Sequence, residues 1–143
     1  MDLREALPLL EENHLAVATS VTRQGRPQAT VVSTALMDGK LVFASPAHTA
    51  KVKNIQRTGR ASLTVIKFDT RRYVTVEGPA SFEPWQDTPE HIARLKHLYV
   101  ASGRTPKGTD EEFARQMRKE ERGLVFITPE HLYGSLQRIN TPS

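Results

Sequence analysis

The sequence has no cysteine among its 143 residues, so disulfide bonds and thiolate metal sites are excluded. It also lacks a long apolar run at its start, because acidic residues interrupt the first segment, MDLREALPLLEENH. This segment therefore predicts neither a signal peptide nor a membrane span. We therefore expect a protein of the cytoplasm that is stabilised by packing alone. The formal net charge is only +4, and basic residues alternate with acidic ones from Arg4 to Arg138, which argues against a nucleic-acid-binding surface.

Motifs for several kinds of chemistry are missing as well. The sequence contains no Gly-x-Ser-x-Gly elbow, Walker sequence or carboxylate pair, so nothing supports hydrolysis or phosphoryl transfer. Of five histidines only His91 and His97 are near each other, and six positions apart on one helix they point in different directions. We expect no metal site and no catalytic side chain; if the protein is an enzyme, a cofactor supplies the chemistry.

The pattern that is present is mainly that of β-strands. A chain of this length suits a single domain, residues 1–143, with one core. Alternation of side-chain character and tight-turn signals such as Asp38-Gly39 predict antiparallel strands in hairpin order. The predicted strands are residues 15–21, 28–35, 41–45, 60–68, 72–84, 124–128 and 131–137. Six or seven strands in this order favour an antiparallel barrel decorated by helices over a doubly wound sheet.

Helical spacing of apolar residues predicts four helices. They begin after the capping residues Asp2, Thr49, Thr88 and Thr109. Pro8 should kink or restart the first helix, and Gly59 should end the second.

The junction between the third predicted strand and the second helix, residues 43–54, carries the strongest local signal for function. Free backbone N–H groups and the helix dipole favour an anion at a helix start. Ser45 and Thr49 can add hydroxyl groups there, and Lys51 or Lys53 can add an ammonium group, which together would make a phosphate site. An ordinary capped helix with solvated lysines explains the same residues, and spacing alone favours that interpretation.

A series of short motifs follows the predicted elements along most of the chain. They are Val17-Ala18-Thr19-Ser20, Gly25-Arg26-Pro27-Gln28, Val32-Ser33-Thr34, Leu41-Val42-Phe43, Lys51-Val52-Lys53-Asn54-Ile55, Arg60-Ala61-Ser62-Leu63, Val76-Glu77-Gly78 and Tyr133-Gly134. In this order they resemble the pyridoxamine phosphate oxidase-like superfamily of FMN-binding split barrels, and more closely its branch that uses the deazaflavin coenzyme F-420. The resemblance implies a split β-barrel that forms a homodimer, with two equivalent cofactor sites at the subunit interface.

The resemblance also implies which residues bind the cofactor. The positions that match are Gln28, Val32, Ser33, Ala44, Ser45, Thr49, Lys51 and Asn54. The first three would line the ring, Ala44 and Ser45 would border the same pocket, Thr49 and Lys51 would meet the phosphate, and Asn54 would support the helix. Tyr133 is a further candidate, because an aromatic side chain can stack on a planar ligand, although packing explains most aromatic residues.

The activity implied by the resemblance is hydride transfer between reduced deazaflavin and an unsaturated or quinone-like acceptor. The chain lacks the basic, tryptophan-containing C-terminal segment of the true pyridoxamine phosphate oxidases and ends with residues 137–143, so we do not expect vitamin B6 oxidation. Thr49 stands where several relatives carry a basic residue, which favours a loosely held cofactor that acts as a cosubstrate. The alternatives are an FMN-dependent oxidoreductase of the same fold and a non-catalytic protein that binds flavin or haem.

Overall fold

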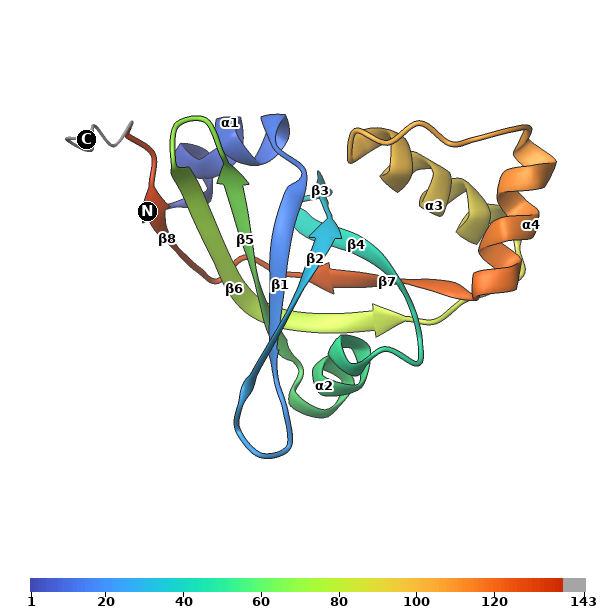
Figure 1. Cartoon of the computed structure of the whole chain (residues 1–143), viewed down its shortest axis with the longest axis horizontal. Helices are drawn as coiled ribbons and strands as arrows, with labels where there is room; N and C mark the ends of the chain where they lie inside the picture. The colour runs from blue at the N-terminus through green and yellow to red at the C-terminus, as the bar shows by residue number, and fades with distance from the viewer. Residues whose placement is uncertain (138–143) are drawn as a thin grey trace.

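Eight antiparallel strands form the body of the protein within residues 1–137, the part of the chain that the computed structural model describes. Their order is β2-β1-β5-β6-β7-β4-β3, with β8 paired to β6 (Figure 1). The strands are β1 (Leu15–Val21), β2 (Pro27–Ser33), β3 (Ala35–Met37), β4 (Lys40–Pro46), β5 (Arg60–Lys67), β6 (Arg72–Glu83), β7 (Arg122–Ile127) and β8 (His131–Ser135). Most of the C-terminal segment noted in the sequence, residues 138–143, lies outside the described residues.

The long strand β6 splits the sheet into two halves. Tyr73 to Glu77 pair with β5 on one side and β8 on the other, whereas Ala80 to Glu83 pair with β7. One strand thereby belongs to both a β1-β2-β5-β8 half and a β3-β4-β7 half, which is the arrangement of a split barrel. The predicted fold class is confirmed.

One strand was missed in the sequence, so the prediction of six to seven strands is corrected to eight. Thr34 separates β2 from β3 because its backbone N–H donates to His14 (2.7 Å) and its hydroxyl donates to the Val42 carbonyl (2.8 Å). The chain exchanges β1 for β4 as its pairing partner at this residue. Alternation of side chains continues through such an exchange, so the sequence pattern does not reveal it.

Over the described residues, four helices decorate the barrel, as predicted. They are α1 (Leu3–Glu12), α2 (Ala50–Thr58), α3 (Pro89–Ala101) and α4 (Asp110–Glu120). Asp2 caps α1 by accepting a hydrogen bond from the Glu5 N–H (2.8 Å), and the helix runs through Pro8 without restarting. In the described part of the chain, no helix is both long and apolar enough to cross a membrane.

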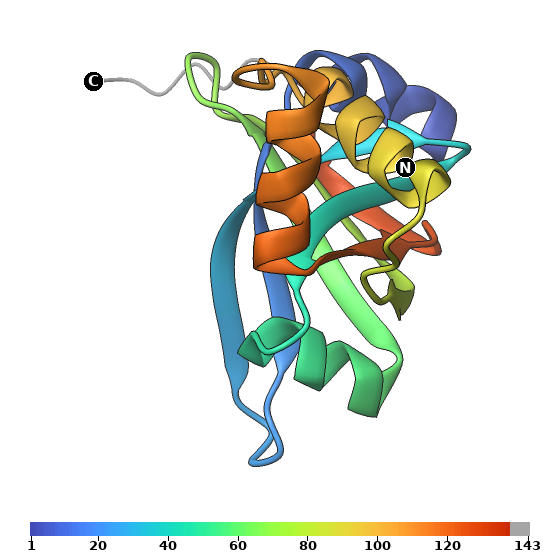
Figure 2. The ribbon, with the colours of Figure 1, turned by 90° about the vertical axis from the view of Figure 1, so that its right-hand side faces the viewer.

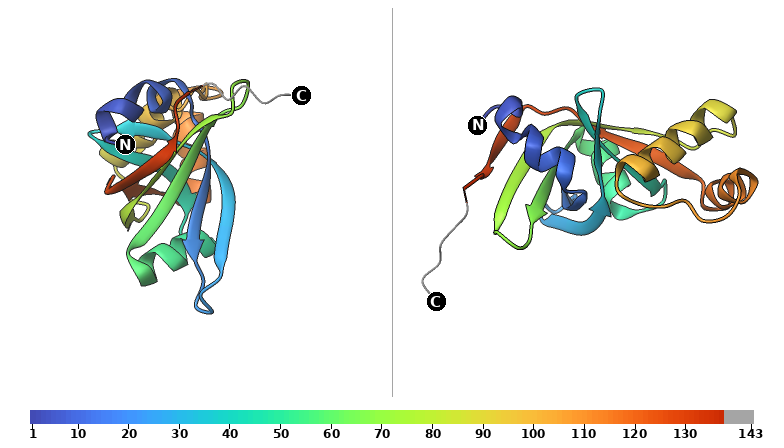
Figure 3. Two further views of the ribbon diagram at one scale, coloured as in Figure 1. Left: turned by 90° about the vertical axis from the view of Figure 1, so that its left-hand side faces the viewer. Right: turned by 90° about the horizontal axis from the view of Figure 1, so that it is seen from above.

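The helices cover different parts of the barrel. Figures 1 and 3 show α1 at one end of the barrel and α2 at the other, and both supply apolar side chains, such as Leu10 and Ile55, to the core between the two halves. Figure 2 shows α3 and α4 standing together on a third side. Leu95, Leu98 and Phe113 from this pair pack against β4 and β7 in a second apolar cluster. Complete burial of a leucine side chain contributes about 1.5–3 kcal/mol, so the helical pair is firmly attached.

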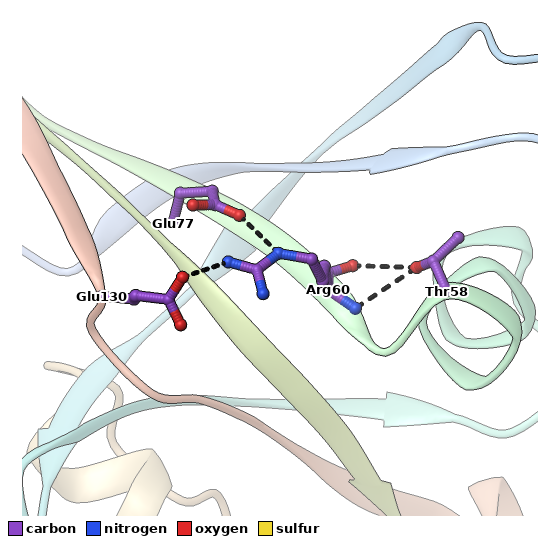
Figure 4. A network of polar contacts seen from close by, with 4 residues as sticks. All are labelled: Thr58, Arg60, Glu77 and Glu130. Carbon is purple, nitrogen blue, oxygen red and sulfur yellow. Dashed lines mark hydrogen bonds and ion pairs between the residues drawn. The ribbon is translucent and has the colours of Figure 1, made fainter.

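The motif around Glu77-Gly78 has a structural role. Arg60 on β5 donates to Glu77 (2.8 Å) and to Glu130 (2.8 Å), as Figure 4 shows, and both carboxylates raise the pKa of Arg60. This exposed network contributes little stability, but it orders the connection from β7 to β8. A Cβ atom on Gly78 would lie 1.9 Å from the Thr128 carbonyl oxygen, so the same connection requires glycine there.

Candidate functional site

The junction between β4 and α2 leaves the start of the helix without a side-chain cap. Thr49 occupies the N-cap position, as predicted, but it makes no capping hydrogen bond to the helix. Its Oγ1 atom instead lies 2.9 Å from the Oγ atom of buried Ser45 and 3.3 Å from the Pro46 carbonyl oxygen, to which it donates. The first turn of α2 also contains no acidic residue. Its backbone N–H groups and positive dipole end therefore favour an anionic ligand.

Two cations lie at this junction. Lys51 in the first turn of α2 is half-buried and has no ion-pair partner among the described residues. Burial lowers the pKa of Lys51, and the charge of Arg122 lowers it further. Arg122 begins β7 directly opposite Pro46 of β4. A half-buried lysine that a neighbouring cation repels marks a place where an anion is stabilising, even though Glu120 pairs with that cation.

Arg122 is held in place from both sides. Its guanidinium donates to Glu120 through Nε. Its carbonyl oxygen accepts a hydrogen bond from Nε2 of buried His91 (2.9 Å), so that nitrogen of His91 carries the proton. Trp85 packs edge-on against the same imidazole, with the ring centres 5.2 Å apart. His91 thus has a structural role, which positions Arg122 beside Lys51.

A chain of polar side chains connects α2 to β1 and β2. Buried Asn54 donates to the Ser20 hydroxyl (3.2 Å), which donates to Gln28 (3.3 Å). Arg57 donates to Asn54 (3.0 Å) and to the Val21 carbonyl oxygen. Asn54 therefore supports the helix by anchoring it to β1. Sequence reasoning missed Ser20 and Arg57, whose roles depend on strands that are distant in the chain.

The inner face of β2 carries Gln28, Thr30 and Val32. These three side chains are partly buried, whereas Ala29 and Val31 between them are exposed. Val32 packs on the core, and the Oγ1 atom of Thr30 is buried without a hydrogen-bond partner among the described residues. Such an atom is available to a ligand. Ser33 follows Val32 and so points to the opposite face, away from Gln28.

The side chains of two further predicted site residues, Ala44 and Tyr133, do not face the start of α2. Ala44 packs against the apolar cluster below α3 and α4, whereas its neighbour Ser45 faces Thr49. Tyr133 is 58% exposed on β8, which Figure 1 shows well separated from α2. The structure therefore brings together Ser45, Thr49 and Lys51, and separately Gln28 and Asn54, but not Ser33, Ala44 or Tyr133.

The arrangement is suited to binding rather than to acid–base chemistry by the protein itself. The uncapped helix start, Lys51 and Arg122 can hold a phosphate group, and the inner face of β2 presents apolar and hydroxyl-bearing side chains. Within residues 1–137 no three His, Asp or Glu side chains gather to hold a metal ion. These residues fit a phosphate-bearing cofactor.

Comparisons with known proteins agree with this architecture. The chain is 22% identical to an F-420 reductase, with a TM-score of 0.68 over 88% of this chain and 94% of that one. It is 21% identical to a conserved hypothetical protein from Mycobacterium tuberculosis, with a TM-score of 0.72 over 100% of this chain and 93% of that one. An FAD-binding protein from Mesorhizobium loti is 17% identical, with a TM-score of 0.60 over 94% of this chain and 92% of that one. At such identities the likeness shows a shared fold.

A family model gives the stronger assignment, because it covers nearly the whole of the described chain. The model described as pyridoxamine 5'-phosphate oxidase matches residues 3–135, from the start of α1 to the end of β8. The protein therefore belongs to the pyridoxamine 5'-phosphate oxidase family.

Proposed function

We propose that the protein is an oxidoreductase that uses coenzyme F-420 and transfers a hydride between the reduced deazaflavin and an unsaturated or quinone-like acceptor. The observation that carries this proposal is the uncapped start of α2 beside Lys51 and Arg122, which fits the phosphate of the coenzyme. Family membership and the likeness to an F-420 reductase support it. The absence of cysteine agrees with the cytoplasmic location that we propose.

Each part of the site has a defined task in this proposal. The α2 amides and Lys51 bind the phosphate, and Gln28 and Val32 on β2 orient the ring. The hydroxyl of Thr30, which lacks a hydrogen-bond partner among the described residues, would be placed to donate to a polar atom of the ring. Bound deazaflavin supplies two electrons as a hydride from one ring carbon. The protein then has to hold this carbon against the acceptor and exclude water, without a nucleophile of its own.

We also propose that two copies of the chain share the site. The outer face of β1 and β2 exposes Leu15, Val21 and Val31, and Val31 is 68% exposed. Apolar side chains grouped on neighbouring strands are typical of an interface. Replacement of Val31 by Lys should therefore give a monomer in light scattering at micromolar concentration, whereas a wild-type monomer would contradict the shared site.

Equilibrium titration with F-420 and with FMN tests the cofactor. We expect tighter binding of F-420, followed by oxidation of reduced F-420 when a quinone such as menadione is added. Tighter or equal binding of FMN would favour the FMN-dependent alternative, to which the likeness to an FAD-binding protein lends support. Binding without electron transfer to any quinone or enone would favour a non-catalytic carrier.

A further inference from the structure

A cavity of about 430 Å³ lies between α4 and the loop that follows α3. Its wall includes Tyr99, Arg104, Lys107, Glu112, Glu120 and Arg122. Cavities that bind small ligands have about this volume. Arg122 belongs both to this wall and to the junction with Lys51, since it begins β7 opposite Pro46. The cavity is therefore next to the phosphate site described above.

Arg104 is held rigidly in this cavity. Its Nε atom donates to the Ser102 hydroxyl (3.1 Å), and its guanidinium carbon lies 3.7 Å from the centre of the Tyr99 ring. Tyr99 in turn packs edge-to-face on buried Phe113, with ring centres 5.3 Å apart. A guanidinium fixed in this way loses little conformational freedom when it binds a ligand.

One nitrogen of this guanidinium lacks a hydrogen-bond partner within residues 1–137. The Nη2 atom of Arg104 is buried and makes no hydrogen bond among the described residues. The two carboxylates of the cavity wall bond to side chains other than Arg104, because Glu120 accepts from Arg122 and Gln116, and Glu112 accepts from Thr109. A buried charged donor without a hydrogen-bond partner destabilises the fold, and an anion in the cavity would offset this cost by neutralising the charge of the guanidinium. Burial is the main cause that lowers the pKa of Arg104; Tyr99 opposes this shift and the charge of Arg122 adds to it, so an anion beside the guanidinium would be stabilising.

We propose that this cavity binds a carboxylate or phosphate group through Arg104, and that Arg122 joins it to the phosphate site at Lys51. The ligand is then an anionic group that the cofactor carries beyond its phosphate, or one that the acceptor carries. Only the choice between these two sources, cofactor or acceptor, rests on the proposed function. The existence of the anion site does not depend on that function.

Citrate, as a small carboxylate probe, tests the anion site without any cofactor. Citrate should raise the melting temperature of the wild-type protein in a saturable way, and Arg104→Gln should weaken its apparent affinity about 10-fold or more. Arg115→Gln is the matched control, because Arg115 is an exposed arginine on α4 outside the cavity wall. Arg104→Lys keeps the charge without the planar fork and should be intermediate, which gives a second variant if Arg104→Gln folds poorly. Equal affinities for wild type and Arg104→Gln, or an equal loss in Arg115→Gln, would overturn the proposal.

The source of the anionic group is tested with the cofactor. If the cofactor supplies it, Arg104→Gln should bind F-420 that has its glutamate tail more weakly than wild type, but should bind the tail-less coenzyme equally well. If the acceptor supplies it, both forms of the coenzyme should bind normally and KM should rise only for acceptors with a carboxylate. If Arg104→Gln neither weakens the binding of F-420 that has its tail nor raises KM for acceptors with a carboxylate, the assignment of the cavity to the redox site is overturned. Failure of F-420 to bind at all, with citrate binding still dependent on Arg104, would remove the proposed function alone.

Discussion

Replacement of Lys51 by Met tests the phosphate site most directly. Lys51 is the cation of α2 that lies half-buried at the helix start, and methionine has a similar length and helix propensity without the charge. Loss of one charge-assisted contact should weaken cofactor binding by about 1.5–3 kcal/mol, or roughly 10- to 150-fold in dissociation constant. We expect the lower part of this range, because Arg122 and the α2 amides remain in place.

The same substitution should leave the stability of the cofactor-free protein unchanged or raise it, although it weakens cofactor binding. Burial and Arg122 lower the pKa of Lys51 from its usual 10.5, so between the folded and unfolded pKa values the folded state binds fewer protons. The free energy of unfolding therefore rises with pH across that window, and at neutral pH the charged lysine opposes folding. Cofactor-free Lys51→Met should melt at the same temperature as wild type or higher, although its affinity for the cofactor is reduced. Residues that trade stability for binding in this way are typical of functional sites.

The assay is fluorescence titration of the coenzyme at two salt concentrations, with thermal melting of each variant measured in parallel. Lys119→Met is the control, since Lys119 is an exposed lysine of α4 with the same charge and no place in the site. We expect this control to bind like wild type. Equal small losses in both variants would mean that only diffuse positive charge attracts the coenzyme, and the site around Thr49 and Lys51 would have to be abandoned.

Three further predictions concern the scaffold. Gly78→Ala should lower the free energy of unfolding in urea by about 3 kcal/mol or more, because its Cβ atom would clash with the backbone at Thr128. Gly25→Ala should cost only about 1–2 kcal/mol, because Gly25 has a φ of +78° but open space around it. Asn54→Ala should cost about 1–3 kcal/mol in the same assay, because it removes the donor to the buried hydroxyl of Ser20 and the acceptor of Arg57. A change below about 0.5 kcal/mol would refute its anchoring role. A hydrogen bond from Arg94 lowers the pKa of Glu83, so Glu83→Gln should be less stable than wild type at neutral pH by under about 1 kcal/mol. This difference in stability should vanish as the pH falls below the ordinary carboxyl range, and a difference that persists in acid would contradict the ion pair.

Local patterns in the sequence were sufficient to predict most of the elements and part of the site. Asp2 caps α1, Gly59 ends α2, and the turn at Asp38-Gly39 joins two strands, because each depends on backbone groups only a few residues away. Ser45 and Thr49 contact each other for the same reason, since they are four positions apart. Residues 43–54 were therefore sufficient to locate the candidate anion site at the start of α2, although their spacing alone favours an ordinary capped helix.

Only the tertiary structure decided which face of each strand is buried and which distant residues meet. Small Ala16 and Ala18 face the core, so the larger Leu15 on the same strand is left exposed, a choice that alternation alone leaves open. Arg122 lies near enough to Lys51 for its charge to lower the lysine pKa because β7 pairs with β4. Arg104 lines the neighbouring cavity because α4 packs beside the loop that follows α3. Contacts such as these follow from long-range strand pairing and from the packing of helices onto the sheet, and spacing along the chain does not encode either of them.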